Sequence, residues 1–221
     1  TTNGMTAHLL NDNELSVLKE CKAEINVSVD SFHDSVQAYI RGTPSALQNA
    51  LKSIQKFSEK AISVTVLTVI SKYNYQDLFD FLTGAYEKGG KQMLFQPVIY
   101  YSNYPERSAI DYKSLLNVSP DKLDILMEEL RKILRFERNH HIKTNVYRIY
   151  PWIVDYLKTA EKQNGEWFFS GLLEKFFCRD VFAIIDISYD GGIQPCPLTE
   201  ASVSIHQNRD PGLMGLWLQA T

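Results

Sequence analysis

Three runs of residues decide the fold: EINVSVD at 24–30, ISVTVLTVI at 62–70 and QMLFQPVIY at 92–100. Their valine, isoleucine, threonine and aromatic residues favour strands. Two amphipathic helical patterns lie between them, one beginning at Thr43-Pro44 and one capped by Asn74 and ending at Gly89-Gly90. Each crossover is long enough to return over a sheet, so the order predicts parallel strands with right-handed connections. The expected fold class is therefore α/β.

The first run alternates between apolar and polar residues, and successive side chains of a strand point to opposite faces. Ile25, Val27 and Val29 fall on one face, and Asn26, Ser28 and Asp30 on the other. Ligands of parallel sheets and barrels bind at the carboxyl ends of the strands, so the polar face predicts a site for a polar ligand such as a ribose. The alternative is that Asp30 and Ser31 only stabilise the turn after the strand.

Arg41 lies just ahead of the first of these helical patterns, between Tyr39 and Gly42. An arginine can bind a carboxylate through two parallel hydrogen bonds. Most surface arginines are merely solvated, so the alternative is that Arg41 is an ordinary surface side chain without a ligand.

The chain before and after this core also contains recognisable elements. A helical pattern at 11–21 precedes the first strand, a polar linker follows at 102–117, and a helix is expected to start at Ser119-Pro120. Further helices are predicted at 147–162, interrupted or restarted at Pro151, and at 167–177. A hairpin follows, with strands at 181–188 and 193–196 around the turn residues Asp190-Gly191-Gly192.

Composition excludes several classes of protein. The 221 residues are 44% hydrophobic and carry a net charge of -3, without the basic excess that nucleic-acid binding usually requires. The most apolar stretch, 61–70, is far shorter than the roughly 20 residues of a membrane span, so no membrane partner is expected. No signal-peptide pattern is present, and three cysteines are too few for a disulfide scaffold. These features favour the cytoplasm.

Cys178 and Cys196 flank the predicted hairpin, which would bring the two thiols together. Pairs of cysteines placed in this way often ligate a metal or an iron-sulfur cluster. Two thiolates are fewer than the usual four ligands, so buried structural cysteines are the alternative.

Four local sequence patterns match motifs of one known enzyme family. They are Thr2-Asn3-Gly4; Val27-Ser28-Val29-Asp30; Asp34 with Tyr39, Arg41 and Gly42; and Cys178-x12-Gly191-x4-Cys196, followed by the tryptophan-containing stretch 213–218. Together they resemble radical S-adenosylmethionine enzymes with a SPASM or twitch extension. The first is similar to the TNG that ends the third barrel strand of these enzymes, the second to the SLD end of the fourth, and the last to the start of the auxiliary-cluster domain.

The resemblance implies a partial (β/α) barrel with parallel strands, C-terminal helices and a small β-hairpin extension. The implied domains are 1–101 for the later part of the barrel, 102–177 for a linker and helical segment, and 178–221 for the start of the auxiliary-cluster domain.

The resemblance also implies a cofactor site. Ser28 would contact the ribose or the methionine end of S-adenosylmethionine, and Arg41 would hold its carboxylate. Asp30 and Asn74 would line the same opening, and Cys178 and Cys196 would be two ligands of an auxiliary 4Fe-4S cluster. Enzymes of this family generate a 5'-deoxyadenosyl radical that abstracts a substrate hydrogen.

The chain departs from the family pattern at both ends. The CxxxCxxC segment, the GGEP-like strand and the remaining auxiliary-cluster cysteines are absent from these residues. The chain therefore resembles the interior part of a longer enzyme and is expected to be inactive alone. The implied partners are a missing N-terminal segment or companion chain, an electron donor, and a peptide or small-molecule substrate.

Two other functions compete with this interpretation. One is a non-catalytic scaffold or partner-binding subunit that retained the later barrel strands and lost its cluster. The other is an unrelated (β/α) enzyme in which Ser28 and Asp30 perform acid/base chemistry while the cysteines are structural.

Overall fold

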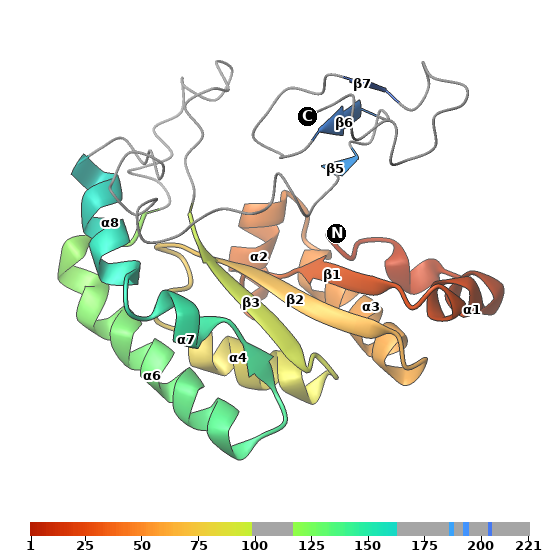
Figure 1. Ribbon diagram of the computed structural model, residues 1–221, viewed down its shortest axis with the longest axis horizontal. Coiled ribbons are helices and arrows are strands. Elements are labelled where there is room, and N and C mark those ends of the chain that lie inside the picture. Colours follow the sequence, from red (N-terminus) through yellow and green to blue (C-terminus); the bar gives the residue numbers. More distant parts are fainter. Residues whose placement is uncertain (99–116, 163–185, 188–191, 195–202, 205–221) are drawn as a thin grey trace. The chain divides into compact units, whose positions relative to one another are not determined.

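The computed structural model describes residues 1–98, 117–162, 186–187, 192–194 and 203–204 (Figure 1). The chain divides into two compact units, one formed by 1–100 with 105–165 and the other by 101–104 with 166–221. The three-domain division expected from the sequence stays a prediction.

The first unit contains a parallel sheet with the strand order β1-β2-β3-β4. The strands are β1 (Glu24–Ser28), β2 (Ser63–Ile70), β3 (Gln92–Pro97) and β4 (Lys143–Thr144). The register places Val27 beside Val66, and Val66 beside Met93. The three parallel strands expected from the sequence are confirmed. A strand of two residues, such as β4, is too short to produce a periodic pattern, which is why it was not predicted.

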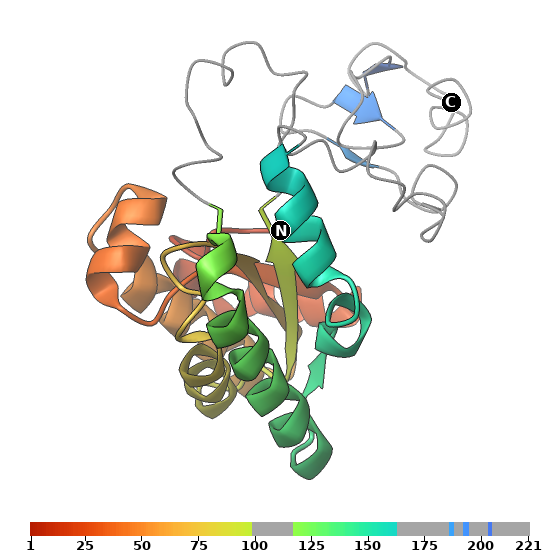
Figure 2. The ribbon, with the colours of Figure 1, turned by 90° about the vertical axis from the view of Figure 1, so that its left-hand side faces the viewer.

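Helices connect the strands and continue the chain after them. They are η1 (Ala7–Leu9), α1 (Asp12–Glu20), α2 (Asp34–Arg41), α3 (Ala46–Glu59), α4 (Leu78–Glu87), η3 (Pro120–Lys122), α6 (Leu123–Asn139), α7 (Val146–Ile149) and α8 (Ile153–Lys162). Helices α3 and α4 lie against the same face of the sheet (Figures 1 and 2).

The core lies between this face and the two helices. The strands contribute Val64, Val66, Ile70, Met93 and Phe95, and the helices contribute Ala50, Ile54, Phe57, Phe81, Leu82 and Ala85, all buried. Alternation along each strand sends the intervening residues to the opposite face. There Ser28, Leu67 and Leu94 are half-buried, and Val69 is 39% exposed. One face is therefore closed by helices, and the other stays partly open.

Several element boundaries differ from the sequence-based expectation. Helix α2 was not predicted. Helix α3 begins at Ala46 rather than at Thr43-Pro44, because a turn closed by the Ala46 N–H and the Thr43 carbonyl precedes it. The N-cap of α4 is Asp77, so the prediction that Asn74 caps this helix was wrong. The expected break near Pro151 is confirmed, since α7 ends at Ile149 and α8 begins at Ile153.

The second unit contains an antiparallel sheet with the order β5-β6-β7. Its strands are β5 (Asp186–Ile187), β6 (Gly192–Gln194) and β7 (Val203–Ser204). The turn residues Asp190 and Gly191, both cysteines Cys178 and Cys196, and the predicted helix at 167–177 lie outside the described residues.

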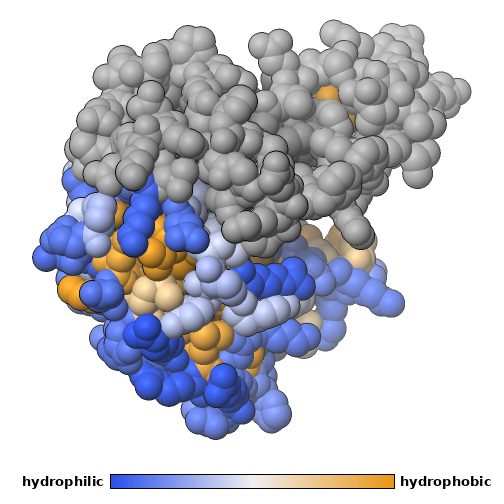
Figure 3. Space-filling view, turned by 60° about the vertical axis from the view of Figure 1, so that its left-hand side comes forward, coloured by the Kyte–Doolittle hydropathy of each residue, from blue (hydrophilic) through white to orange (hydrophobic). Residues whose placement is uncertain are grey.

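The described surface is mainly hydrophilic in the view of Figure 3, with apolar side chains gathered among hydrophilic ones. Amphipathic helices whose apolar sides pack inward produce such a surface. No helix among the described residues is long and apolar enough to cross a membrane.

Candidate functional site

The carboxyl ends of β1 and β2 are joined by side chains where the backbone ladder stops. The last backbone bond runs from the Val29 N–H to the Leu67 carbonyl at 2.9 Å. Beyond it, the Thr68 hydroxyl donates to the Val29 carbonyl at 2.7 Å, and the Val69 N–H donates to Asp30 Oδ1 at 3.1 Å. The two strands therefore separate here, as parallel strands do next to many ligand sites.

Asp30 and Arg41 form an ion pair at this edge, with 2.5 Å between Asp30 Oδ2 and a terminal nitrogen of Arg41. The side chain of Asp30 is 4% exposed and that of Arg41 is 27% exposed. A buried carboxylate needs a charged partner and further hydrogen bonds, and Asp30 has both. Because each of its oxygens is already engaged, Asp30 is poorly suited to act as a general base.

Gln37 on α2 fixes the backbone beside this pair. Its Oε1 accepts hydrogen bonds from the N–H groups of Asp30 and Ser31, at 2.9 and 3.0 Å. Gln37 is fully buried, yet its Nε2 has no hydrogen-bond partner, and neither has the buried Nε of Arg41. Sequence reasoning missed Gln37. The available signal was its spacing of four residues from Arg41, which places both on one helix face.

Asn74 ties the two strand ends together from the loop after β2. Its amide nitrogen donates to the Asp30 carbonyl at 2.7 Å and to the Val69 carbonyl at 2.8 Å, while its oxygen accepts from the Ser71 N–H at 2.8 Å. The residue is 2% exposed. These bonds explain why Asn74 is not available as a helix cap.

Ser28 lies on the open face, two residues before Asp30. In the strand register it stands beside Leu67, and both are half-buried. The structure thus brings Ser28, Asp30, Arg41 and Asn74 to one edge of the sheet.

The segment Thr2-Asn3-Gly4 runs along the outer edge of β1. The Thr2 N–H donates to the Asn26 carbonyl at 2.7 Å, and the Ser28 N–H donates to the Thr2 carbonyl at 2.9 Å. Gly4 has a φ of 73°, and a Cβ there would lie 2.8 Å from the Cα of Ala50. Only glycine fits this close approach to α3.

Two tyrosines are close in the sequence to residues of this edge: Tyr39 comes two residues before Arg41, and Tyr73 comes one residue before Asn74. The rings of Tyr39 and Tyr73 are 5.4 Å apart, and Lys72 Nζ lies 5.1 Å from the centre of the Tyr73 ring. A hydrogen bond with Tyr73 raises the pKa of Tyr39 above its usual value. Tyr39 is 67% exposed, so it offers aromatic surface to solvent.

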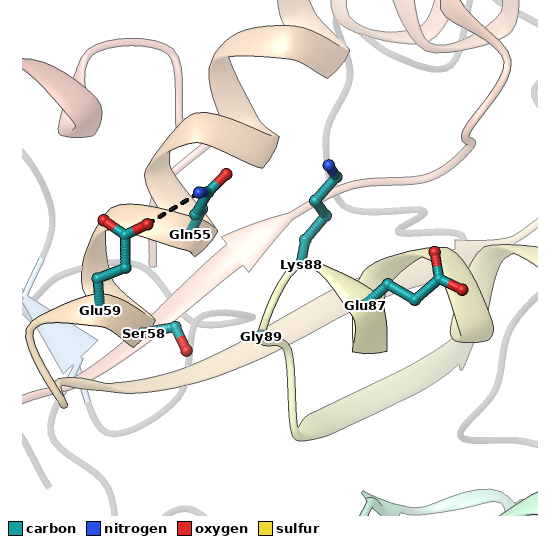
Figure 4. A pocket seen from close by; sticks show the side chains of 6 residues that line it. All are labelled: Gln55, Ser58, Glu59, Glu87, Lys88 and Gly89. Carbon is teal, nitrogen blue, oxygen red and sulfur yellow. Dashed lines mark hydrogen bonds between the residues drawn. The ribbon is translucent and has the colours of Figure 1, made fainter.

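Two pockets of the described residues lie at the opposite, amino edge of the sheet. Figure 4 shows the smaller one, between Gln55, Ser58 and Glu59 of α3 and the end of α4 at Glu87 and Gly89. The larger, about 510 Å³, is also lined by Ser58 and Gly89, and by Lys91, His141 and Lys143. Three helices end beside these pockets, and basic residues commonly stabilise helix carboxyl ends. We therefore place the candidate site at the carboxyl edge, where buried polar groups converge.

Metal ligation finds no support within the described ranges. They contain no cluster of three or more histidine, cysteine, aspartate or glutamate side chains that could hold an ion. The cysteine that the structure describes, Cys21, is exposed and free.

Comparison with known proteins gives similarity of structure only. No family model and no curated protein matches the chain. Among solved structures, native anSMEcpe with bound AdoMet and Cp18Cys peptide matches with a TM-score of 0.56 and 12% identity, covering 96% of this chain and 55% of that chain. Streptococcus suis SuiB matches with a TM-score of 0.56 and 16% identity, covering 96% and 47%. Native anSMEcpe with bound AdoMet matches with a TM-score of 0.53 and 14% identity, covering 88% and 49%.

The chain thus spans about half the length of these solved structures. At such low identity the similarity establishes the fold alone. Closure into a partial barrel and the hairpin extension stay predictions. The chain therefore shares the α/β fold of anSMEcpe and of SuiB.

Proposed function

We propose that this chain is the S-adenosylmethionine-binding portion of a radical S-adenosylmethionine enzyme, with the cofactor bound at the carboxyl edge of β1 and β2. The observation that carries the proposal is the partly exposed guanidinium of Arg41 at this edge. Arg41 pairs with Asp30 and still has an unpartnered Nε. Such a donor fits an anionic group of a ligand.

The residues present fit the cofactor's chemistry. Arg41 would bind the carboxylate, and Asp30 would keep the guanidinium in place. Ser28 would donate to or accept from the ribose or the methionine end, and the half-buried Leu67 beside it adds an apolar surface. Asn74 would hold the two strand ends at a fixed separation.

S-adenosylmethionine, bound together with an iron-sulfur cluster, supplies hydrogen abstraction from a substrate. The residues of this chain would bind and orient it. The proposed ligands of an auxiliary 4Fe-4S cluster, Cys178 and Cys196, rest on the sequence resemblance. A peptide or small-molecule substrate, an electron donor, and a further segment or companion chain belong to the same proposal, as does a cytoplasmic location. The peptide bound to anSMEcpe is consistent with the peptide alternative.

Substitution of Arg41 tests the proposal. Arg41→Ala should weaken S-adenosylmethionine binding by about 1.5 to 3 kcal/mol, the usual loss for a charge-assisted hydrogen bond. Titration calorimetry on the chain, alone and joined to any further segment of its gene product, measures this. Arg138→Ala at the exposed end of α6 is the matched control and should bind like the unaltered protein. Equal affinities for the Arg41 variant and the unaltered chain would show that Arg41 does not bind the cofactor carboxylate.

The structure gives one observation in favour of a non-catalytic scaffold. Asp30 already neutralises Arg41 at 2.5 Å, an arrangement that a purely structural ion pair would also produce. A scaffold would not bind S-adenosylmethionine even when joined to the rest of its gene product, and Arg41→Ala would then change stability only. The same titrations therefore separate the two functions.

A further inference from the structure

Gln37 has no role in the proposed site as described so far, yet its position is unusual. We propose that Gln37 is a ligand-binding residue whose Nε2, together with Nε of Arg41, donates to the carboxylate of the bound S-adenosylmethionine. This inference rests on the proposed function and adds to it a residue that the sequence patterns did not identify.

The first argument is the burial of an unpaired donor. Gln37 is 0% exposed, and its Oε1 is fully used by the N–H groups of Asp30 and Ser31. The bonds to Oε1 fix the orientation of the amide, so Nε2 cannot exchange places with the oxygen without losing them. A buried N–H without an acceptor is costly, and native proteins tolerate few of them.

The second argument is that a second unpaired donor lies on the same face of α2. Gln37 and Arg41 are four residues apart, so their side chains are neighbours on the helix. Both contact Asp30, Gln37 through the backbone N–H and Arg41 through the carboxylate. Asp30 holds one terminal nitrogen of Arg41 and leaves Nε without a partner. Two donors on one face of a helix can both bind one carboxylate.

Other unpartnered atoms do not share this arrangement. His8 Nδ1 and Asn117 Oδ1 are also buried without a hydrogen bond, but they belong to separate parts of the chain. Gln37 and Arg41, by contrast, belong to one helix, and the Arg41 guanidinium pairs with Asp30 and is 27% exposed.

Gln37→Glu separates ligand binding from structure. A glutamate keeps an oxygen that accepts from the Asp30 and Ser31 N–H groups, but it replaces the donor with an anionic oxygen. S-adenosylhomocysteine carries the amino-acid carboxylate, and 5'-methylthioadenosine lacks it. We expect Gln37→Glu to weaken S-adenosylhomocysteine binding at least tenfold and to change 5'-methylthioadenosine binding less than twofold.

Titration calorimetry of the full chain with both compounds measures this difference, with Gln55→Glu on the exposed side of α3 as the matched charge control. If Gln37→Glu fails to fold by circular dichroism, Gln37→Met removes the donor without adding charge and should lower S-adenosylhomocysteine affinity about fivefold, again with little change for 5'-methylthioadenosine.

Each other outcome has a distinct meaning. Unchanged S-adenosylhomocysteine affinity in the variant, or equal losses for both compounds, would overturn the role of Gln37 and leave the proposed function standing. Failure of the unaltered protein to bind either compound, both alone and joined to any further segment of its gene product, would overturn the proposed function and this inference with it.

Discussion

At the scale of single residues, buried polar side chains replace the backbone ladder where β1 and β2 separate. Asp30, Thr68 and Asn74 are at most 4% exposed, and each bonds to backbone groups of the neighbouring strand end. In a dry environment such bonds matter mainly because the alternative is an unsatisfied buried group. The same residues that position the candidate ligand donors therefore also hold the sheet together.

Asn74→Ala should lower the free energy of unfolding by about 2 to 4 kcal/mol, because it leaves two buried carbonyls and one N–H without partners. Urea denaturation followed by circular dichroism measures this loss. Asn49→Ala is the control, since Asn49 makes only a side-chain contact with Ser45 at the exposed start of α3, and should change stability by less than about 0.5 kcal/mol. Equal effects of the two substitutions would show that Asn74 does not tie the strands.

The residues of this edge were predictable from the sequence to a large extent, but their partners were not. Ser28 and Asp30 were identified because they alternate with apolar residues along a strand, and because ligands of parallel sheets bind at the carboxyl ends of the strands. The pairing of Asp30 with Arg41 depends on how the chain returns through α2, which no local pattern fixes. The spacing of Gln37 from Arg41 places the two on one helix face, but nothing in the sequence indicates that this glutamine is buried.

At the scale of elements, the two crossover helices α3 and α4 were recognisable and the short elements were not. Helix α3 has 14 residues with an apolar face, whereas α2 has eight and buries only Gln37. A helix of eight residues is too short to be stable by itself, so the formation of α2 depends on tertiary contacts. The polar group at the strand ends thus contributes to the stability of α2.

Gly4 shows how closely the segment 2–4 packs on α3. Gly4→Ala should cost about 2 to 4 kcal/mol, since it combines a left-handed backbone with a Cβ placed 2.8 Å from Ala50 Cα. Gly42→Ala is a matched control with the same φ of 73° and no atom within 4 Å, so only the backbone cost of about 1 to 2 kcal/mol should remain. Thermal unfolding of both variants measures the difference, and similar losses would argue against the close approach.

At the scale of the whole molecule, the first unit has one face covered by α3 and α4 and another that is partly open. The parallel order of β1, β2 and β3 was predictable, because repeated strand and helix patterns fix the direction of the strands. The division into two units was not, since it depends on contacts between distant segments. The proposed cofactor site uses the open face and the edge where its strands end.

The most direct test of this account is to locate S-adenosylmethionine on the protein by following backbone amide resonances during a titration. The account predicts shifts at Ser28, Asp30, Gln37 and Arg41, around the carboxyl edge of β1, with little change at Lys91 and His141 in the amino-edge pocket. Shifts confined to the amino-edge pocket, or no shifts at saturating cofactor, would contradict it.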